Sequence, residues 1–109
     1  MGASTLELTD ANLAEVVAQG VTLVDFWAER CPPCRIQGPI VEEMAERFAG
    51  RAKVGKLDVD SNTKMATELG LMYIPTIIIF KDGEEVKRFT GLQQEEALAS
   101  ALEGALAGA

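Results

Sequence analysis

The two cysteines of the chain, Cys31 and Cys34, are separated by Pro32 and Pro33 in the stretch RCPPCR. Two thiols at positions i and i+3 at the start of a helix lie close enough to form a disulfide and to open it with little backbone movement. The same spacing beside alternating strands and helices is typical of redox-active dithiols. The pair therefore indicates thiol–disulfide exchange, with a Cys31–Cys34 disulfide as the oxidised state.

Two other uses of a cysteine pair fit the sequence less well. A zinc site takes about four ligands, commonly Cys and His, whereas the chain has no His and no third Cys. A structural disulfide across so short a loop would contribute only ~2 kcal/mol, and a chain of this length can bury a core without it. We therefore expect a redox pair that needs neither a metal nor a cofactor.

Composition and charge limit the class of protein. The 109 residues suffice for one domain, 1–109, and their net charge of −7 argues against a nucleic-acid partner. No apolar run approaches the ~18 residues of a membrane span. Because no Lys or Arg precedes Arg30, the basic head of a signal peptide is missing. We therefore expect a cytoplasmic protein with no membrane partner.

Strand and helix patterns alternate along the chain. Apolar alternation and β-branched runs predict strands, whereas apolar residues at helical spacing, bounded by capping residues and glycines, predict helices. A buried strand directly precedes the cysteines, and a helix begins at Cys31. The predicted elements, in order, are a strand (4–8), a helix (9–20), a strand (21–28), a helix (31–50), a strand (52–60), a helix (61–70), a hairpin (75–90) and a helix (93–109).

Some local details of the helices can also be predicted. Thr9 or Asp10 is expected to cap the first helix, and Ser61 or Asn62 the third, because short polar side chains accept hydrogen bonds from free helical N–H groups. The helix that starts at Cys31 should bury one apolar stripe. The residues expected on that stripe are Ile36, Ile40, Val41, Met44 and Phe48.

Several motifs occur together in a recognisable order. They are VDFWAERCPPC, the Gly38-Pro39 pair, KLDVD, IPT at 74–76, FKDGE and Gly91 after the last strand. Over essentially its whole length the chain resembles the thioredoxin family. The resemblance implies an α/β thioredoxin fold, in which four helices flank a five-stranded mixed central sheet. It also implies that Pro75 is cis and stands against the cysteines.

The same resemblance implies a function and partners. A thioredoxin is a thiol–disulfide oxidoreductase that reduces disulfides in partner proteins through a mixed disulfide. Its partners would be disulfide-containing target proteins and a flavin-dependent thioredoxin reductase, or another reductase, that returns it to the dithiol form. We expect a monomer.

The positions of the cysteines in the predicted helix suggest different roles for them. Cys31 would be the N-cap, where free N–H groups and the positive end of the helix dipole favour a thiolate, and Arg30 and Arg35 add positive charge. We expect Cys31 to be the exposed nucleophile with a lowered pKa. Cys34 lies one turn inside the helix and is expected to be the more buried, resolving thiol.

Two charged residues interrupt apolar strands. Asp25 lies within VTLVDF and Lys56 follows Val54. One interpretation is that the two simply pair with each other or reach solvent, because buried charges are usually paired. The other is that burial raises the pKa of Asp25, so that it accepts the proton of Cys34 while Lys56 modulates it. In the family, the corresponding residues lie behind the cysteines in that role.

Four more residues match functional positions of the family. Trp27 matches a tryptophan that shields the site, and Ile74, Pro75 and Gly91 match a surface on which a partner's extended chain docks through backbone hydrogen bonds. For Trp27 and Ile74, packing in the core is an equally simple explanation.

The active-site motif departs from the family pattern, Trp-Cys-Gly-Pro-Cys. If Cys31 is the N-cap, Pro32 falls at the first helical position, where proline is favoured. Neither Pro32 nor Pro33 can donate an N–H to the thiolate, which leaves the N–H of Cys34 as the main backbone donor. The lost donor favours a more reducing couple, whereas Arg30 in place of tryptophan acts in the opposite direction.

Tyr73 is the second departure, because many thioredoxins have a small residue two positions before the cis proline. It is expected either to narrow the docking groove and stack with Arg30, or to be an exposed aromatic side chain with no special role. If Arg30 and Tyr73 alter partner choice, the chain is a specialised thioredoxin that serves a dedicated reductase or target. A disulfide oxidase or isomerase on the same fold and a non-enzymatic binding module are further alternatives.

Overall fold

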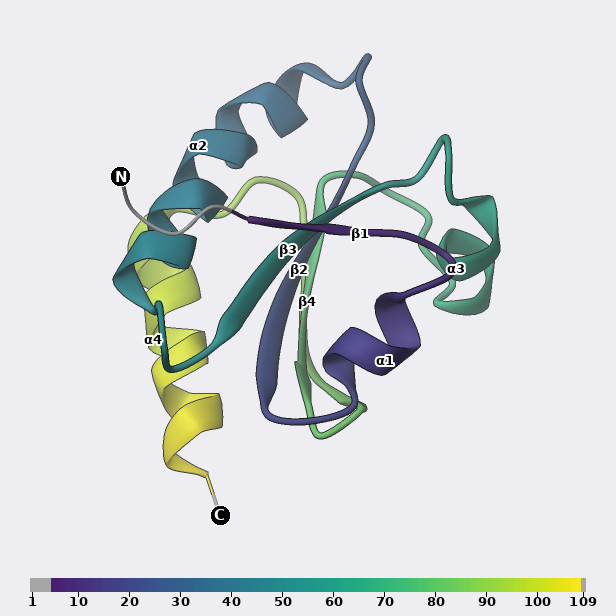
Figure 1. Ribbon diagram of the computed structural model, residues 1–109. Coiled ribbons are helices and arrows are strands. Elements are labelled where there is room, and N and C mark those ends of the chain that lie inside the picture. Colours follow the sequence, from purple (N-terminus) through teal and green to yellow (C-terminus); the bar gives the residue numbers. More distant parts are fainter. Residues whose placement is uncertain (1–4, 109) are drawn as a thin grey trace.

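The computed structural model describes residues 5–108 and has the predicted order of elements (Figure 1). The five strands of its sheet are β1 (Leu6–Leu8), β2 (Val21–Trp27), β3 (Lys53–Asp58), β4 (Thr76–Lys81) and β5 (Glu84–Thr90). The helices of the described residues are α1 (Leu13–Val17), α2 (Pro32–Arg47), α3 (Thr63–Glu68) and α4 (Glu95–Ala107). The α/β class, the strand count and the helix count are therefore confirmed.

The sheet is mixed, with the strand order β1-β3-β2-β4-β5. Strands β1, β3 and β2 run parallel, whereas β4 and β5 pair antiparallel. Helices α2 and α4 lie on one side of the sheet, and α1 and α3 lie on the other (Figure 1). None of the helices described between residues 5 and 108 is long and apolar enough to span a membrane.

Central strand β2 determines where Asp25 lies. All of its residues except the last are buried, as expected for a strand covered on both faces. Successive side chains alternate between faces: Val21 and Leu23 pack with α2 and α4, whereas Val24 and Phe26 pack with α1. Asp25 therefore points toward the face that α2 covers, which is the helix that carries the cysteines.

The polar side chains at the starts of the first and third helices do not form the hydrogen bonds that the sequence predicted. Asn12 is the N-cap of α1 and Asn62 that of α3, and neither side chain caps its own helix. Instead, the carboxylate of Asp10 accepts hydrogen bonds from the N–H groups of Met65 (2.8 Å) and Lys64 (3.3 Å), in the first turn of α3. The N-cap of α1 is therefore neither Thr9 nor Asp10. The hydroxyl group of Thr9 does accept from the N–H groups of Ala11 and Asn12, at 3.2 Å each, in the turn that leads into α1, whereas Asp10 bonds to a helix 55 residues away in sequence.

The apolar stripe predicted for α2 was wrong at one position. Ile36 is 57% exposed, whereas its neighbour Gln37 is fully buried. A helix turns by about 100° per residue, and the face that includes Cys34, Val41 and Met44 also includes position 37, not position 36. A polar side chain therefore lies inside the core, and an apolar one lies on the surface one residue before it.

Two turns were predicted correctly. The Ile74–Pro75 peptide bond is cis, as the family resemblance implied. Asp82 and Gly83 form the two-residue loop between β4 and β5, with φ angles of 51° and 88°. Such angles are typical of the hairpin turns that Asp-Gly sequences favour.

Candidate active site

Cys31 is the N-cap of α2, as predicted. Its backbone is extended, with φ −131° and ψ 98°, and Pro32 and Pro33 occupy the first two helical positions. The N–H of Cys34 donates to Cys31 Sγ at 3.2 Å, so the donor singled out from the sequence is in place. Proline suits this position because its fixed φ matches the helix and its missing N–H would be unpaired there.

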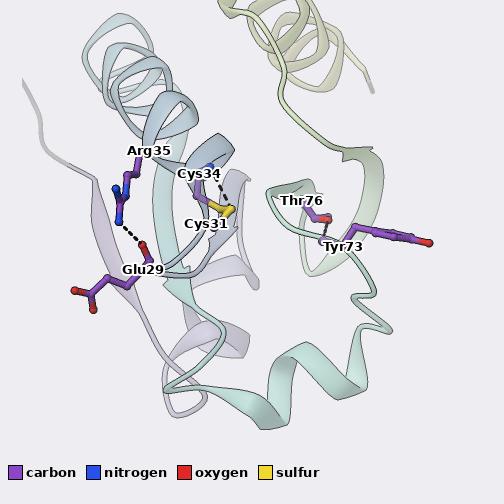
Figure 2. The surroundings of a disulfide bond; sticks show 6 residues. All are labelled: Glu29, Cys31, Cys34, Arg35, Tyr73 and Thr76. Atoms are coloured by element: carbon purple, nitrogen blue, oxygen red, sulfur yellow. Dashed lines mark hydrogen bonds between the residues drawn. A yellow bond between two sulfur atoms is a disulfide. The ribbon is translucent and has the colours of Figure 1, made fainter.

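The two cysteines form a disulfide, drawn in Figure 2, with their Cα atoms 5.2 Å apart. Cys31 is 6% exposed and Cys34 is 5% exposed. The expected difference in exposure is therefore absent in this state, because the bond holds both sulfurs in one cluster with Trp27 and Ile74. In this state the two cysteines differ in their position along the helix and hardly at all in their exposed fraction.

Asp25 is completely buried, and neither carboxylate oxygen has a hydrogen-bond partner. Burial raises its pKa from 3.8 to about 7, although the nearby positive charge of Lys56 lowers it. Asp25 and Lys56 lie opposite each other on β2 and β3. Within residues 5–108 the ion pair of Lys56 is with Glu42, at 4.0 Å between Nζ and Oε2, and not with Asp25. Direct pairing of Asp25 with Lys56, one part of the first interpretation, is therefore wrong; Lys56 is partly exposed to solvent, whereas Asp25 is not.

Lys56 lies in a groove behind the disulfide. Its ammonium group is 5.3 Å from the centre of the Trp27 ring, a distance at which a cation is attracted to the ring face. The groove has a volume of about 310 Å³, and its lining includes Trp27, Cys34, Glu42 and Lys56. Trp27, which is partly buried, thus contacts both the cysteine cluster and this charged groove.

On the other side of the disulfide lies the loop with the cis peptide bond. Ile74 is partly buried against the two cysteines, and the N–H of Gly91 donates to the carbonyl oxygen of Pro75 at 2.8 Å. The hydroxyl group of Thr76 donates to the carbonyl oxygen of Tyr73 (Figure 2). These bonds hold 73–76 and Gly91 together as one surface next to the cysteines.

Tyr73 and Arg30 do not form the predicted stack. Tyr73 is 68% exposed, and Figure 2 shows its ring pointing away from the disulfide. The cation–π contacts found in residues 5–108 do not include this pair. Arg35 reaches back along the helix start instead, where its guanidinium group donates to the carbonyl oxygen of Glu29 at 3.4 Å (Figure 2).

Sequence reasoning missed Gln37. Its amide donates to the carbonyl oxygen of Gln93 at 3.0 Å and accepts from the N–H of Gln93 at 2.7 Å. The available signal was its spacing, because position 37 is one turn after Cys34 and one turn before Val41. A polar residue at that spacing on a buried face needs a partner inside the protein.

Comparison with known proteins gives a consistent result. The thioredoxin family model matches residues 4–104. A thioredoxin from Staphylococcus saprophyticus is 45% identical over 98 residues, which cover 90% of this chain and 94% of the relative. A thioredoxin from Staphylococcus haemolyticus is 46% identical with the same coverage. Among solved structures, a mutant thioredoxin from Halobacterium salinarum NRC-1 matches with a TM-score of 0.89 and 36% identity, covering 97% of this chain and 94% of that one.

Proposed function

The chain belongs to the thioredoxin family, and from that premise we propose how its own residues carry out the reaction. The activity is that of a thiol–disulfide oxidoreductase that reduces disulfides in partner proteins. Its partners are disulfide-containing targets and a reductase that restores the dithiol. The observation that carries the proposed mechanism is the N-cap geometry of Cys31, with the N–H of Cys34 directed at its sulfur.

The exchange proceeds in two steps. In the reduced protein, the Cys31 thiolate attacks one sulfur of the partner disulfide, forms a mixed disulfide and releases the partner's other sulfur as a thiolate. Cys34, as its thiolate, then attacks Cys31 Sγ. The bond between Cys31 and the partner breaks, the partner leaves as a dithiol, and Cys31 and Cys34 are left oxidised. The helix N-terminus stabilises the Cys31 thiolate in the reduced protein.

Asp25 is the proposed acceptor of the proton that Cys34 loses in the second step. A carboxylate with a pKa of about 7 is a much better base than one with the ordinary value, and it is still ionised in half of the molecules near neutral pH. Its position on β2, on the face that α2 covers, supports this role. Lys56 modulates the base, because its positive charge opposes the effect of burial.

The loop at Pro75 is the proposed docking surface for the partner. An extended segment of the target would lie along Ile74, Pro75 and Gly91 and bind through backbone hydrogen bonds. Trp27 shields the cysteines on the groove side. The contacts of Ile74 and Trp27 with the cysteine cluster support this assignment.

The two prolines favour reductase function over oxidase or isomerase function. A disulfide oxidant needs a strongly stabilised thiolate. Proline at both positions after Cys31 removes two N–H donors from the first helical turn, and the hydrogen bond from the N–H of Cys34 is the backbone contact that supports the sulfur. The couple should accordingly stay reducing despite Arg30.

The finer identity of the partners and the setting are also part of the proposal. A flavin-dependent reductase recycles the protein, which acts as a monomer in the cytoplasm. Arg30 and Tyr73 are exposed at separate places near the disulfide, and each would contact a docked partner independently. Equal rates of reduction by a general thioredoxin reductase for the wild type and for an Arg30→Trp, Tyr73→Gly variant would contradict this selectivity.

A trapping experiment tests the mechanism. The Cys34→Ser variant lacks the resolving thiol, so we expect it to accumulate mixed disulfides with target proteins that a thiol reductant releases. The matched control, Cys31→Ser, should trap few or none because Cys34 is not at the helix N-terminus. Equal trapping by both single variants, or none by Cys34→Ser, would overturn the assignment of roles.

A further inference from the structure

The side chain of Gln37 is fully buried in α2, yet both ends of its amide are bonded. Both partners are backbone atoms of Gln93, in the segment between β5 and α4. Two opposed hydrogen bonds to one residue fix position and orientation together, which a single contact or an apolar side chain does not do. Nothing in the exchange reaction described above requires this amide.

The bonds extend from Gln93 to the docking surface. The side-chain amide of Gln93 donates to the carbonyl oxygen of Gly91 at 3.3 Å, and the N–H of Gly91 donates to the carbonyl oxygen of Pro75 at 2.8 Å. A continuous series of hydrogen bonds therefore runs from Gln37, one turn after Cys34, to the cis proline. It joins the helix that carries the disulfide to the loop that faces it.

Holding the two helices together does not require this link. Helices α2 and α4 already share an apolar cluster that includes Val41, Met44, Leu98 and Leu102. An apolar residue at position 37 would extend that cluster without burying a polar side chain, whereas an amide must be fully bonded to be tolerated there. The amide fixes the position of Gln93, and Gln93 in turn fixes the position of Gly91.

We propose that Gln37 is a positioning residue that sets the separation between the disulfide and the Pro75–Gly91 surface, and so determines how tightly extended protein substrates dock. The inference rests on the proposed docking of substrate at Pro75 and Gly91. A partner must place its own sulfur at Cys31 while its backbone lies on this loop, so a displaced loop weakens binding. A small disulfide that makes no contact with the loop is insensitive to the displacement.

The test compares two substrates and two glutamines. Gln37→Met keeps the length of the side chain and removes both bonds, and Gln94→Met makes the same change at the exposed N-cap of α4, whose side chain forms no cap bond. We expect Gln37→Met to raise the KM for a protein disulfide about tenfold, as for the loss of one net hydrogen bond. Its kcat for that protein, and its rate with a small aromatic disulfide reagent, should change less than about twofold. Gln94→Met should match the wild type throughout.

A second variant checks that the hydrogen bonds are responsible. When protonated, the carboxyl group of a Gln37→Glu variant can donate to the Gln93 carbonyl and accept from its N–H. We expect the KM of this variant to fall toward the wild-type value as the pH is lowered, with no such recovery for Gln37→Met. If Gln37→Met does not fold, this pH dependence carries the test.

The outcomes separate this inference from the proposed function. Equal losses with both substrates, or no rise in KM for the protein disulfide, would overturn the role of Gln37. If the wild type reduced the small reagent but not protein disulfides, the proposed docking of protein substrates at Pro75 and Gly91 would be wrong.

Discussion

Asp25 and Gln37 are both fully buried, on a strand and on the helix that covers it, yet their polar atoms are treated in opposite ways. Each end of the Gln37 amide has a hydrogen-bond partner. Neither oxygen of Asp25 has one. A buried polar group without a partner costs free energy, so the first arrangement is neutral for the fold and the second is unfavourable.

The difference indicates what each residue contributes. A satisfied amide fixes geometry, here between α2 and Gln93 in the segment before α4. An unsatisfied carboxylate keeps a raised pKa, which a hydrogen-bond donor or a close cation would have lowered. Lys56 forms its ion pair with Glu42 and not with Asp25, so its positive charge only partly offsets the effect of burial on the pKa of Asp25. In the proposed mechanism, the cost in stability at Asp25 is the condition for its use as a base near neutral pH.

The largest expected effect is on stability at Asp25. Its pKa is higher in the folded protein than in the unfolded chain, so the folded protein binds more protons, and stability falls as the pH rises toward the folded value. Between about pH 5 and about pH 9 the wild type should lose roughly 3 kcal/mol from this group, at 1.36 kcal/mol per unit up to pH 7. Denaturant unfolding of the wild type and Asp25→Asn at both values measures the loss.

The Asp25→Asn variant carries the same buried polar shape without the ionisation. The free energy of unfolding of Asp25→Asn should increase relative to that of the wild type as the pH rises. Parallel pH curves for the two proteins would show that Asp25 titrates normally, and the contrast with Gln37 would disappear.

The next largest effect is a loss of stability when the satisfied amide of Gln37 is removed. Gln37→Met leaves the N–H and the carbonyl group of Gln93 without their partners and should lower the free energy of unfolding by about 1–2 kcal/mol. The exposed control Gln94→Met should stay within about 0.5 kcal/mol of the wild type. A stabilised Gln37→Met protein would mean that the amide is no better placed than an apolar residue.

The smallest effect is expected at a third buried polar residue, Thr22, on the opposite face of β2 from Asp25. Its hydroxyl group has no hydrogen-bond partner and faces away from the cysteine helix. Thr22→Val should raise the free energy of unfolding by up to about 1 kcal/mol and leave the rate of disulfide reduction unchanged. A lower rate of disulfide reduction would show that an unpaired buried group can affect activity without lying beside the cysteines.

Local signals predicted much of the fold and the centre of the site. The order of strands and helices followed from periodicity, and the Asp82-Gly83 turn from its dipeptide. The N-cap position of Cys31 was expected at the predicted helix start, and the two prolines that follow it suit that position. These features depend on a few consecutive residues, so a single sequence contains the information. The cis bond before Pro75 came from the family resemblance instead.

The features that sequence analysis missed depend on residues far apart in the chain. Asp10 caps α3 because the fold brings the turn after β1 against the start of α3. Gln37 lies on the buried face of α2 where Ile36 was expected. Which of the two is buried depends on the rotation of α2 about its axis and on a hydrogen-bond partner at Gln93. The expected stack of Arg30 on Tyr73 failed because the tyrosine ring points outward, which no local pattern specifies. The pairing of Lys56 with Glu42 likewise joins a strand to a helix.

The most direct test of the account is the pH dependence of the resolving step. A labelled peptide held on Cys31 as a mixed disulfide is released when Cys34 attacks, and its release can be timed in the wild type and in Asp25→Asn. If Asp25 accepts the proton of Cys34, the wild-type rate should rise through about pH 7, and the variant should be about tenfold or more slower there. The difference should close at high pH, where Cys34 ionises unaided. Identical profiles for the two proteins would contradict this role and leave Asp25 as an unexplained charge in the core.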